Sequence, residues 1–202
     1  NIYNDLLQMG VDVITMGNHT WDNKDIFEFI DDADYLIRPA NFSKDAPGRG
    51  MMQIEKNGVT LSVINLHGRV FLPPHEGPFA MADELVAEAK KISPLVFVDF
   101  HAEATSEKIA LGWHLDGRAS AVVGTHTHVQ TADERIVDDH CAAISDLGMC
   151  GPYHSVIGRD IDEILRRFKY QEQTRFTMAE GKGIFCGCIV EIDDETNQAI
   201  SI

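Results

Sequence analysis

Apolar positions along the chain follow two patterns, short continuous runs and stripes with helical spacing. Runs of β-branched and other apolar residues begin at Val11, Leu95 and Ala119, and they have the length of buried strands. The segment 80–92 instead spaces its apolar residues as one face of an amphipathic helix does. Because strands and helices alternate through most of the sequence, the pattern predicts a layered α/β fold.

A hairpin is the most clearly marked local structure. The runs 51–56 and 59–66 flank Asn57 and Gly58. Both of these residues tolerate a positive φ, which a two-residue hairpin turn requires. We therefore predict two antiparallel strands joined at this dipeptide.

Further elements follow from the same patterns. Helices are predicted over 25–33, 106–111 and 160–170. Short strands are predicted at 36–37 and 141–148. The tail has strand-like runs at 174–180, 185–193 and 199–202. Because no helix separates these last runs, we expect them to form an antiparallel layer.

The size and charge of the chain limit the classes of function. With 202 residues, 44% of them hydrophobic, it can bury one sizeable core, so a single domain over 1–202 is expected. The 32 acidic residues outnumber the 17 basic ones, which gives a formal net charge of -15. This charge argues against an extended surface for DNA or RNA. A small anionic substrate remains compatible with it if metal ions supply positive charge locally.

The two ends and the cysteines bear on where the protein works. No apolar stretch is long enough to span a bilayer and no leader is visible, so a soluble, cytoplasmic protein with no membrane partner is expected. The chain opens at Asn1 directly into a helical pattern, so we also expect that a segment precedes it. The four cysteines include no C-x-x-C pair, and reduced structural thiols are favoured over a zinc site. Cys186 and Cys188 are expected on one face of a strand.

Metal-binding side chains follow three of the predicted strands. They are Asn18 and His19 after the first run, His101 after the second, and His126 and His128 after the third. In an open α/β sheet the carboxyl ends of parallel strands lie along one edge, where ligands characteristically bind. The sequence therefore predicts that these side chains converge.

The chemistry of this set favours a metal site. A single histidine at a strand end is more often a hydrogen-bonded structural residue than a ligand. The H-x-H at 126–128, taken alone, is evenly balanced between metal binding and a structural role. Three such strand ends together favour metal binding. Imidazole nitrogen and amide oxygen suit iron, manganese or zinc. Two neighbouring metal ions can hold a phosphate and activate a water molecule, so phosphate-ester hydrolysis is the favoured reaction.

The blocks GNH at 17–19, DFHAE at 99–103 and GTHTH at 124–128 resemble those of the calcineurin-like metallophosphoesterases. Within that superfamily, stretches such as ITMGNHTWD, DFHAEATSEK and GTHTHVQTAD resemble the bacterial YmdB-like 2',3'-cyclic-nucleotide 2'-phosphodiesterases almost throughout. The resemblance implies an α/β/β/α sandwich with mixed sheets and an enzyme that hydrolyses 2',3'-cyclic nucleotides, with 3',5'-cyclic nucleotides as further substrates. It leaves a homo-oligomer open.

The resemblance also implies roles for single residues. Asn18, His101 and His126 would hold one metal ion and His128 would belong to a second. His19 would stand beside the substrate phosphate as a proton donor. The metal pair expected from the resemblance is iron, with manganese as the alternative.

One departure from the family affects these expectations. The family supplies an aspartate and a bridging glutamate with an asparagine from a G-D and a G-E-N block, and neither block occurs in this sequence. We therefore expect that the fold lacks its first strands, that the domain is incomplete at its N-terminus, and that the 202-residue form binds metal weakly. His67 stands where related chains often carry a glutamine.

Charged residues near the motifs have simpler interpretations. Glu103 is evenly balanced between orienting His101 and facing solvent. Asp22 is favoured as a helix cap. Arg69 and Arg118 are favoured for surface pairing over phosphate binding.

Two other classes of function remain as alternatives. The first is a regulatory or binding module with the same fold and little or no catalysis. The second is another metal hydrolase. An amidohydrolase would carry its H-x-H on the first strand, and a metallo-β-lactamase would follow it with D-H, whereas Val129 and Gln130 stand here.

Overall fold

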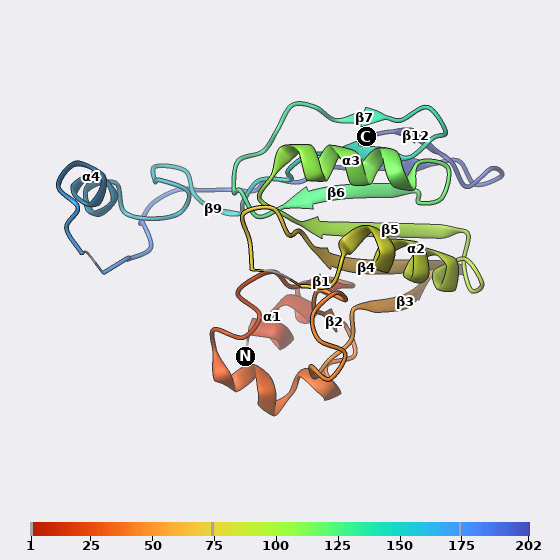
Figure 1. Ribbon diagram of the computed structural model, residues 1–202, viewed down its shortest axis with the longest axis horizontal. Coiled ribbons are helices and arrows are strands. Elements are labelled where there is room, and N and C mark those ends of the chain that lie inside the picture. Colours follow the sequence, from red (N-terminus) through yellow and green to blue (C-terminus); the bar gives the residue numbers. More distant parts are fainter. Residues whose placement is uncertain (1, 74, 174) are drawn as a thin grey trace.

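A six-stranded mixed sheet forms the centre of the computed structural model, which describes residues 2–73, 75–173 and 175–202. In spatial order its strands are β3 (Met51–Lys56), β4 (Val59–His67), β5 (Leu95–His101), β6 (Ala121–Thr125), β8 (Ala142–Ile144) and β7 (Arg135–Ile136). The four inner strands are parallel, and the two edge strands run antiparallel to their neighbours. The predicted mixed α/β fold is confirmed (Figure 1).

The hairpin at the β3 edge matches the prediction. Asn57 and Gly58 have φ values of 55° and 79°, so both adopt the left-handed conformation that a tight hairpin turn requires. The strands pair from Lys56 opposite Val59 to Met51 opposite Ile64.

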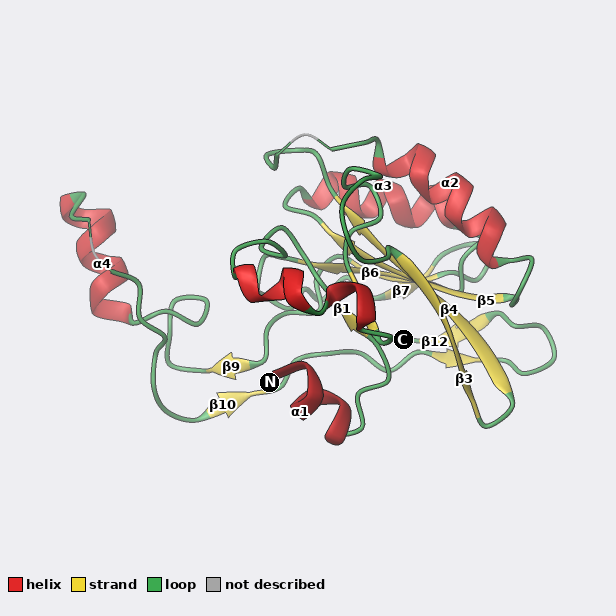
Figure 2. Ribbon diagram, turned by 90° about the horizontal axis from the view of Figure 1, so that it is seen from below, coloured by secondary structure: helices red, strands yellow, loops and turns green. Residues whose placement is uncertain are grey.

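Two helices cover one face of the sheet, as Figure 2 shows. They are α2 (Pro78–Ala89) and α3 (Thr105–Leu115). The first begins two residues before the predicted start at 80, with Pro78 in its first turn, where a missing N–H costs nothing. The second runs beyond the predicted 106–111 because Leu111 and Leu115 continue its buried face against the core.

The N-terminal part packs beside the β3–β4 edge (Figure 1). It contains α1 (Ile2–Gln8) and a parallel pair of two-residue strands, β1 (Ile14–Thr15) and β2 (Leu36–Ile37). The α-helix predicted over 25–33 is wrong in type. Two 3-10 turns, η1 (Lys24–Glu28) and η2 (Ile30–Asp32), stand there, because Phe29, with φ -142°, breaks the helical conformation between them.

The C-terminal part differs most from the prediction. An arm made of β9 (Gly151–Pro152), α4 (Ile161–Tyr170) and β10 (Gly183–Ile184) extends away from the sheet, as Figures 1 and 2 both show. After it, β11 (Glu191–Ile192) and β12 (Ala199–Ser201) form an antiparallel pair. The antiparallel character of the tail is confirmed, but its strands are shorter than predicted.

Two of the predicted tail strands are absent or shortened in the structure. Within 175–180 only Met178 makes a β-bridge, while residue 174 lies outside the described residues. The predicted strand 185–193 is reduced to β11, and Phe185 is 89% exposed, so no partner strand covers that run. Cys186 and Cys188 therefore do not share a strand face, and among the four cysteines only Cys141 is buried.

Candidate metal centre

The carboxyl ends of the parallel strands β4, β5 and β6 lie in one row. His67, His101 and Thr125 are direct neighbours across these strands. In Figure 1 the three arrowheads point to the same edge of the sheet. The two-residue strand β1 reaches this edge as well, because the Asn65 side-chain amide in β4 donates to the Met16 carbonyl, 2.6 Å away.

A tight turn follows β1 and presents Asn18 and His19. The backbone N–H and the hydroxyl of Thr20 both donate to the Gly17 carbonyl, at 3.1 and 2.6 Å. A Cβ on Gly17 would overlap the His101 imidazole, and one on Gly124 would overlap the Ser145 carbonyl. Neither glycine has a positive φ. Both are needed for close approach rather than for a sharp backbone turn.

Three of the predicted ligands come together. The Asn18 Oδ1 atom lies 2.8 Å from His101 Nε2, and His126 Nδ1 lies 3.2 Å from the same nitrogen. These three side chains come from three strand ends, as predicted. His128 makes a different contact, since it is exposed and its Nδ1 atom donates to the Ile157 carbonyl at 3.0 Å.

The position of the His101 proton follows from its neighbours. Thr125 Oγ1 donates its single proton to Asp99 Oδ1, 2.8 Å away. The same oxygen must then accept from His101 Nδ1, which lies at 3.1 Å. Burial, together with the neighbouring His126 and His67, lowers the pKa of His101 to about 3. The ring is therefore neutral near pH 7 and keeps a lone pair on Nε2.

His126 is arranged in the same way. Its Nε2 atom lies 2.8 Å from Glu103 Oε2, so in the neutral ring Nε2 donates to the carboxylate and Nδ1 keeps the lone pair. Glu103 thus orients His126. The sequence had left Glu103 balanced between orienting His101 and facing solvent. This pairing could not be read from the sequence, because it depends on the backbone conformation at His126, which has φ 110°.

The chemistry of the three converging atoms fits a cation. An amide oxygen and two bare imidazole nitrogens are all acceptors, and acceptors 2.8–3.2 Å apart repel one another unless a positive charge lies among them. Metal–nitrogen bonds of about 2.0–2.1 Å in a tetrahedral site place ligand atoms roughly 3.3 Å apart, close to this spacing. The donor set therefore suits a divalent transition metal.

Other polar residues close to this edge have distinct surroundings. Burial raises the pKa of Asp99 to about 6, while hydrogen bonds from Thr15 and Thr125 oppose the rise. The imidazole of His67 is fully buried, and neither ring nitrogen has a hydrogen-bond partner among the described residues. Burial and the neighbouring His75 lower the pKa of His67 to about 4. His67 therefore backs the site as a neutral ring.

His19, like His128, is exposed. Its Nδ1 atom lies 2.7 Å from Asp22 Oδ2. Asp22 is therefore a partner of His19 and not the helix cap favoured from the sequence. Asn23 caps η1 instead, since its side chain accepts from the Asp25 N–H. The i,i+3 spacing of His19 and Asp22 was the signal in the sequence for this pair.

The arginines considered in the sequence differ in their contacts. Arg118 binds Asp83 at 2.6 Å and the His114 carbonyl, so the predicted surface pairing is confirmed. The backbone N–H of Arg69 donates to the buried carboxylate of Glu107. No role in phosphate binding follows from these contacts.

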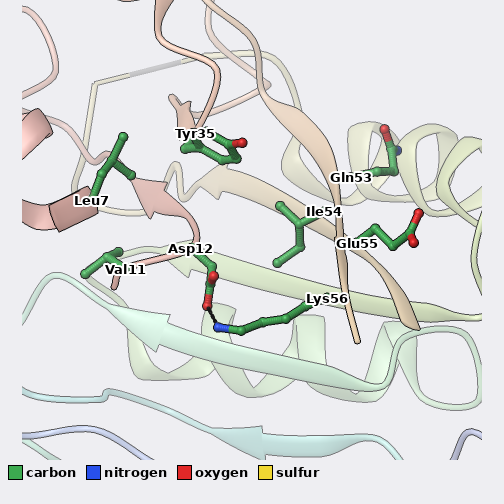
Figure 3. A pocket seen from close by; sticks show the side chains of 8 residues that line it. All are labelled: Leu7, Val11, Asp12, Tyr35, Gln53, Ile54, Glu55 and Lys56. Atoms are coloured by element: carbon green, nitrogen blue, oxygen red, sulfur yellow. Dashed lines mark hydrogen bonds and ion pairs between the residues drawn. The ribbon is translucent and has the colours of Figure 1, made fainter. Parts of the chain in front are cut away.

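A cavity of about 380 Å³ lies elsewhere, between the end of α1 and strand β3, as Figure 3 shows. Asp12 and Lys56 form an ion pair of 2.6 Å at its wall, and Leu7 and Val11 add apolar surface. None of the predicted site residues is among the described residues that line it. The cavity is separate from the strand-end cluster.

Comparison with known proteins gives a consistent result at every level. A family model described as "YmdB-like protein" matches residues 1–202. The 2',3'-cyclic-nucleotide 2'-phosphodiesterase of Bacillus subtilis (strain 168) is 59% identical over 201 residues, which cover 100% of this chain and 76% of that protein. A putative phosphatase/phosphodiesterase of Mycoplasma pneumoniae is 38% identical over 206 residues, covering 98% of this chain and 72% of that protein.

Solved structures agree with the fold. A hypothetical protein from Thermus thermophilus has a TM-score of 0.90 at 38% identity, with 98% of this chain and 77% of that chain covered. A phosphatase from Mycoplasma pneumoniae has a TM-score of 0.90 at 36% identity, with 98% and 73% covered. A putative 5'-nucleotidase from Staphylococcus aureus, at 16% identity and a TM-score of 0.55, covers 73% of this chain and 34% of that one and shares the fold alone. Within the described residues, no helix is long and apolar enough to cross a membrane.

Proposed function

The chain belongs to the YmdB-like protein family, and from this premise we propose that it is a metal-dependent phosphodiesterase that hydrolyses cyclic nucleotides. The observation that carries the proposal is the convergence of three bare lone pairs, on Asn18, His101 and His126. Such a set binds a cation and has no evident use in a neutral core. The 59% identity to a named phosphodiesterase supports the reaction class.

Asn18, His101 and His126 would hold one metal ion, and His128 would take part in binding a second. When bound, the metal ions supply positive charge for the phosphate and Lewis acidity for the attacking water. The proposed metal is iron, with manganese as the alternative. His128 is not one of the three converging ligands. This chain therefore supplies fewer ligands for the second metal ion than for the first.

His19 acts on the leaving oxygen in this proposal. Its Nδ1 atom lies 2.7 Å from Asp22 Oδ2, so Asp22 orients the ring and leaves the Nε2 side free to face the leaving oxygen as the proton donor. Hydrolysis of a 2',3'-cyclic phosphate breaks one P–O bond and leaves an alkoxide, which takes up that proton. Because both side chains are largely exposed, substrate can reach them directly.

A small phosphodiester is the substrate class that the charge of the protein favours. With a net charge of -15 the surface repels a polyanion, whereas a single phosphate beside a metal ion meets local positive charge. We therefore propose 2',3'-cyclic nucleotides as substrates, with 3',5'-cyclic nucleotides as a second class to be tested.

The test is to load the metal-stripped protein with Fe²⁺ or Mn²⁺ and measure product formation from 2',3'-cyclic AMP and 3',5'-cyclic AMP. We expect metal-dependent turnover that chelator abolishes, and a loss of at least about a hundredfold for His19→Ala with metal content unchanged. His101→Ala should lose both metal and turnover. Asp83→Asn, on the exposed pair with Arg118, is the matched control and should change neither.

Two results would contradict the proposal. Turnover that persists in chelator would remove the metal dependence. Binding of the cyclic nucleotide without hydrolysis by the metal-loaded protein would favour a regulatory or binding module instead.

A further inference from the structure

A buried ion pair lies behind the strand-end cluster. Lys108 Nζ in α3 is 2.7 Å from Asp146 Oδ2, just after β8, and the two side chains are 3% and 1% exposed. Pairs this deeply buried lose much hydration, and their attraction does not always offset that loss. Holding α3 against the sheet does not by itself account for a buried ion pair at this position.

The carboxylate of Asp146 also binds the loop that carries two predicted ligands. Its Oδ2 atom accepts hydrogen bonds from the backbone N–H of Thr127 at 2.9 Å and from the Thr127 hydroxyl at 2.8 Å. Its Oδ1 atom accepts from the Gly148 N–H at 2.9 Å. With Lys108 the carboxylate has four donors, three of them on Oδ2.

Thr127 is the residue between His126 and His128, and both histidines have unusual backbones. Their φ values are 110° and 68°, a region that residues with a side chain rarely adopt. Such conformations persist only where the surrounding structure holds them, and they cluster at functional sites. The two hydrogen bonds from Thr127 to Asp146 act at the centre of this strained segment.

We propose that Asp146 and Lys108 are positioning residues for the metal site, acting through Thr127 to set the directions in which His126 and His128 point. This inference rests on the proposed metal-dependent function. The negative charge accepts both Thr127 hydrogen bonds, and Lys108 compensates that charge where water is excluded. The pair touches neither substrate nor metal.

The sharpest test leaves the ion pair in place. Thr127→Val removes the hydroxyl donor with little change in shape, and Thr127→Ser keeps it. The matched control is Thr131→Val, because the Thr131 hydroxyl also bonds to Asp146 but only to its backbone groups. Asp146→Asn would leave the buried Lys108 charge unpaired and endanger the fold, so it is used only as a secondary variant.

The first measurement is a titration of the metal-stripped proteins with Co²⁺, followed by its visible absorption. We expect Thr127→Val to bind about tenfold more weakly and with an altered Co²⁺ spectrum, as the loss of a supporting partner typically does. Thr127→Ser should recover both properties. Thr131→Val should retain the wild-type affinity and spectrum, and the thermal midpoints of all three should stay within a few degrees of wild type.

The second measurement needs no metal. Imidazole nitrogen shifts of His126 and His128, recorded by NMR on the metal-free protein, should change in Thr127→Val and return in Thr127→Ser. If the wild type binds Co²⁺ while Thr127→Val keeps its affinity, spectrum and ring shifts, the positioning role is wrong and the metal site stands. An equal effect of Thr131→Val would also overturn the positioning role. If the wild type binds no Co²⁺, the proposed function fails first, and the inference fails with it.

Discussion

His101 and His126 each have a free lone pair because a neighbour accepts a hydrogen bond from the other ring nitrogen. Thr125 does this for His101, and Glu103 does it for His126. Partners of this kind fix both the tautomer and the direction of an imidazole. The sequence predicted that His101 and His126 gather with Asn18, but it also included His19 and His128, whose contacts lie elsewhere. It could not predict which atom of each ring would face the proposed metal ion, because that depends on contacts between separate strands.

A different buried residue, Cys141, gives a test that depends on pH. Its thiol is fully buried, and burial, with the charge of Asp116, raises its pKa from 9.0 to about 12. In the unfolded chain the thiol ionises from about pH 8.5 upward, whereas the folded protein retains the proton. Stability should therefore fall as the pH rises from about 9 toward 12.

We expect Cys141→Val to lose about 2 kcal/mol less of its unfolding free energy than the wild type between pH 8 and pH 10. Urea unfolding at both pH values measures the difference. The exposed Cys150 is the control, and Cys150→Ser should follow the wild type. Equal alkaline losses in all three proteins would show that the Cys141 proton does not couple to folding.

At the scale of the elements, parallel register assembles the site. His67, His101 and Thr125 occupy one row across β4, β5 and β6, so a shift of one residue in either pairing would turn the site residues to the other face of the sheet. The hairpin at Asn57–Gly58 fixes the edge of that sheet.

Gly17 allows the turn after β1 to pass close to β5. A Cβ there would overlap the His101 ring, which can move because it is a side chain, whereas the backbone at Gly17 has no positive φ to strain. Gly17→Ala should therefore displace His101 and weaken Mn²⁺ binding by about tenfold or more, with little loss of stability.

Calorimetric titration with Mn²⁺ and a thermal melt measure the two effects of Gly17→Ala. Gly112→Ala is the matched control, since its Cβ would meet Ala143 at an ordinary 3.5 Å, away from the strand-end cluster. It should leave the affinity for Mn²⁺ unchanged. Tight Mn²⁺ binding by Gly17→Ala would mean that His101 is not a ligand.

The elements differed in how well the sequence predicted them. The hairpin, the parallel strands and helix α2 carried strong periodicity and turn residues, and all are present. The segment at 24–32 has apolar residues at helical spacing, yet only Ile26 and Ile30 are buried, and 3-10 turns suffice to bury them. The run from Phe185 to Val190 is apolar enough for a strand, but strands form only where a partner is available.

At the scale of the whole molecule, the arm stands out from a compact body (Figure 2). Its helix α4 buries one residue, Ile164, while Phe168 and Tyr170 are 75% and 66% exposed. The helix is capped by Asp160, and Arg167 lies over Phe176, 4.6 Å from its ring centroid. Local contacts thus hold the arm together, whereas the main sheet depends on a continuous core.

Brief digestion of the native protein with chymotrypsin should therefore cleave first in the arm, at Phe168 or Tyr170. Segments with few buried contacts open at low free energy, and proteolysis follows such openings. Mass spectrometry identifies the cuts. The two fragments should still migrate together in size exclusion, since β12 returns to pack against the main sheet through Ala199. First cuts within β4–β6, or a protected arm, would contradict this expectation.

The spacing of Asn18, His101 and His126 along the chain also decides when the proposed metal ion could bind. Asn18 and His101 are 83 positions apart, and His101 and His126 a further 25. During synthesis the N-terminal turn emerges long before its partners, and two parallel pairings must close before the three atoms meet. In the proposed site, metal binding would then follow sheet formation, so protein made without metal should be folded but inactive.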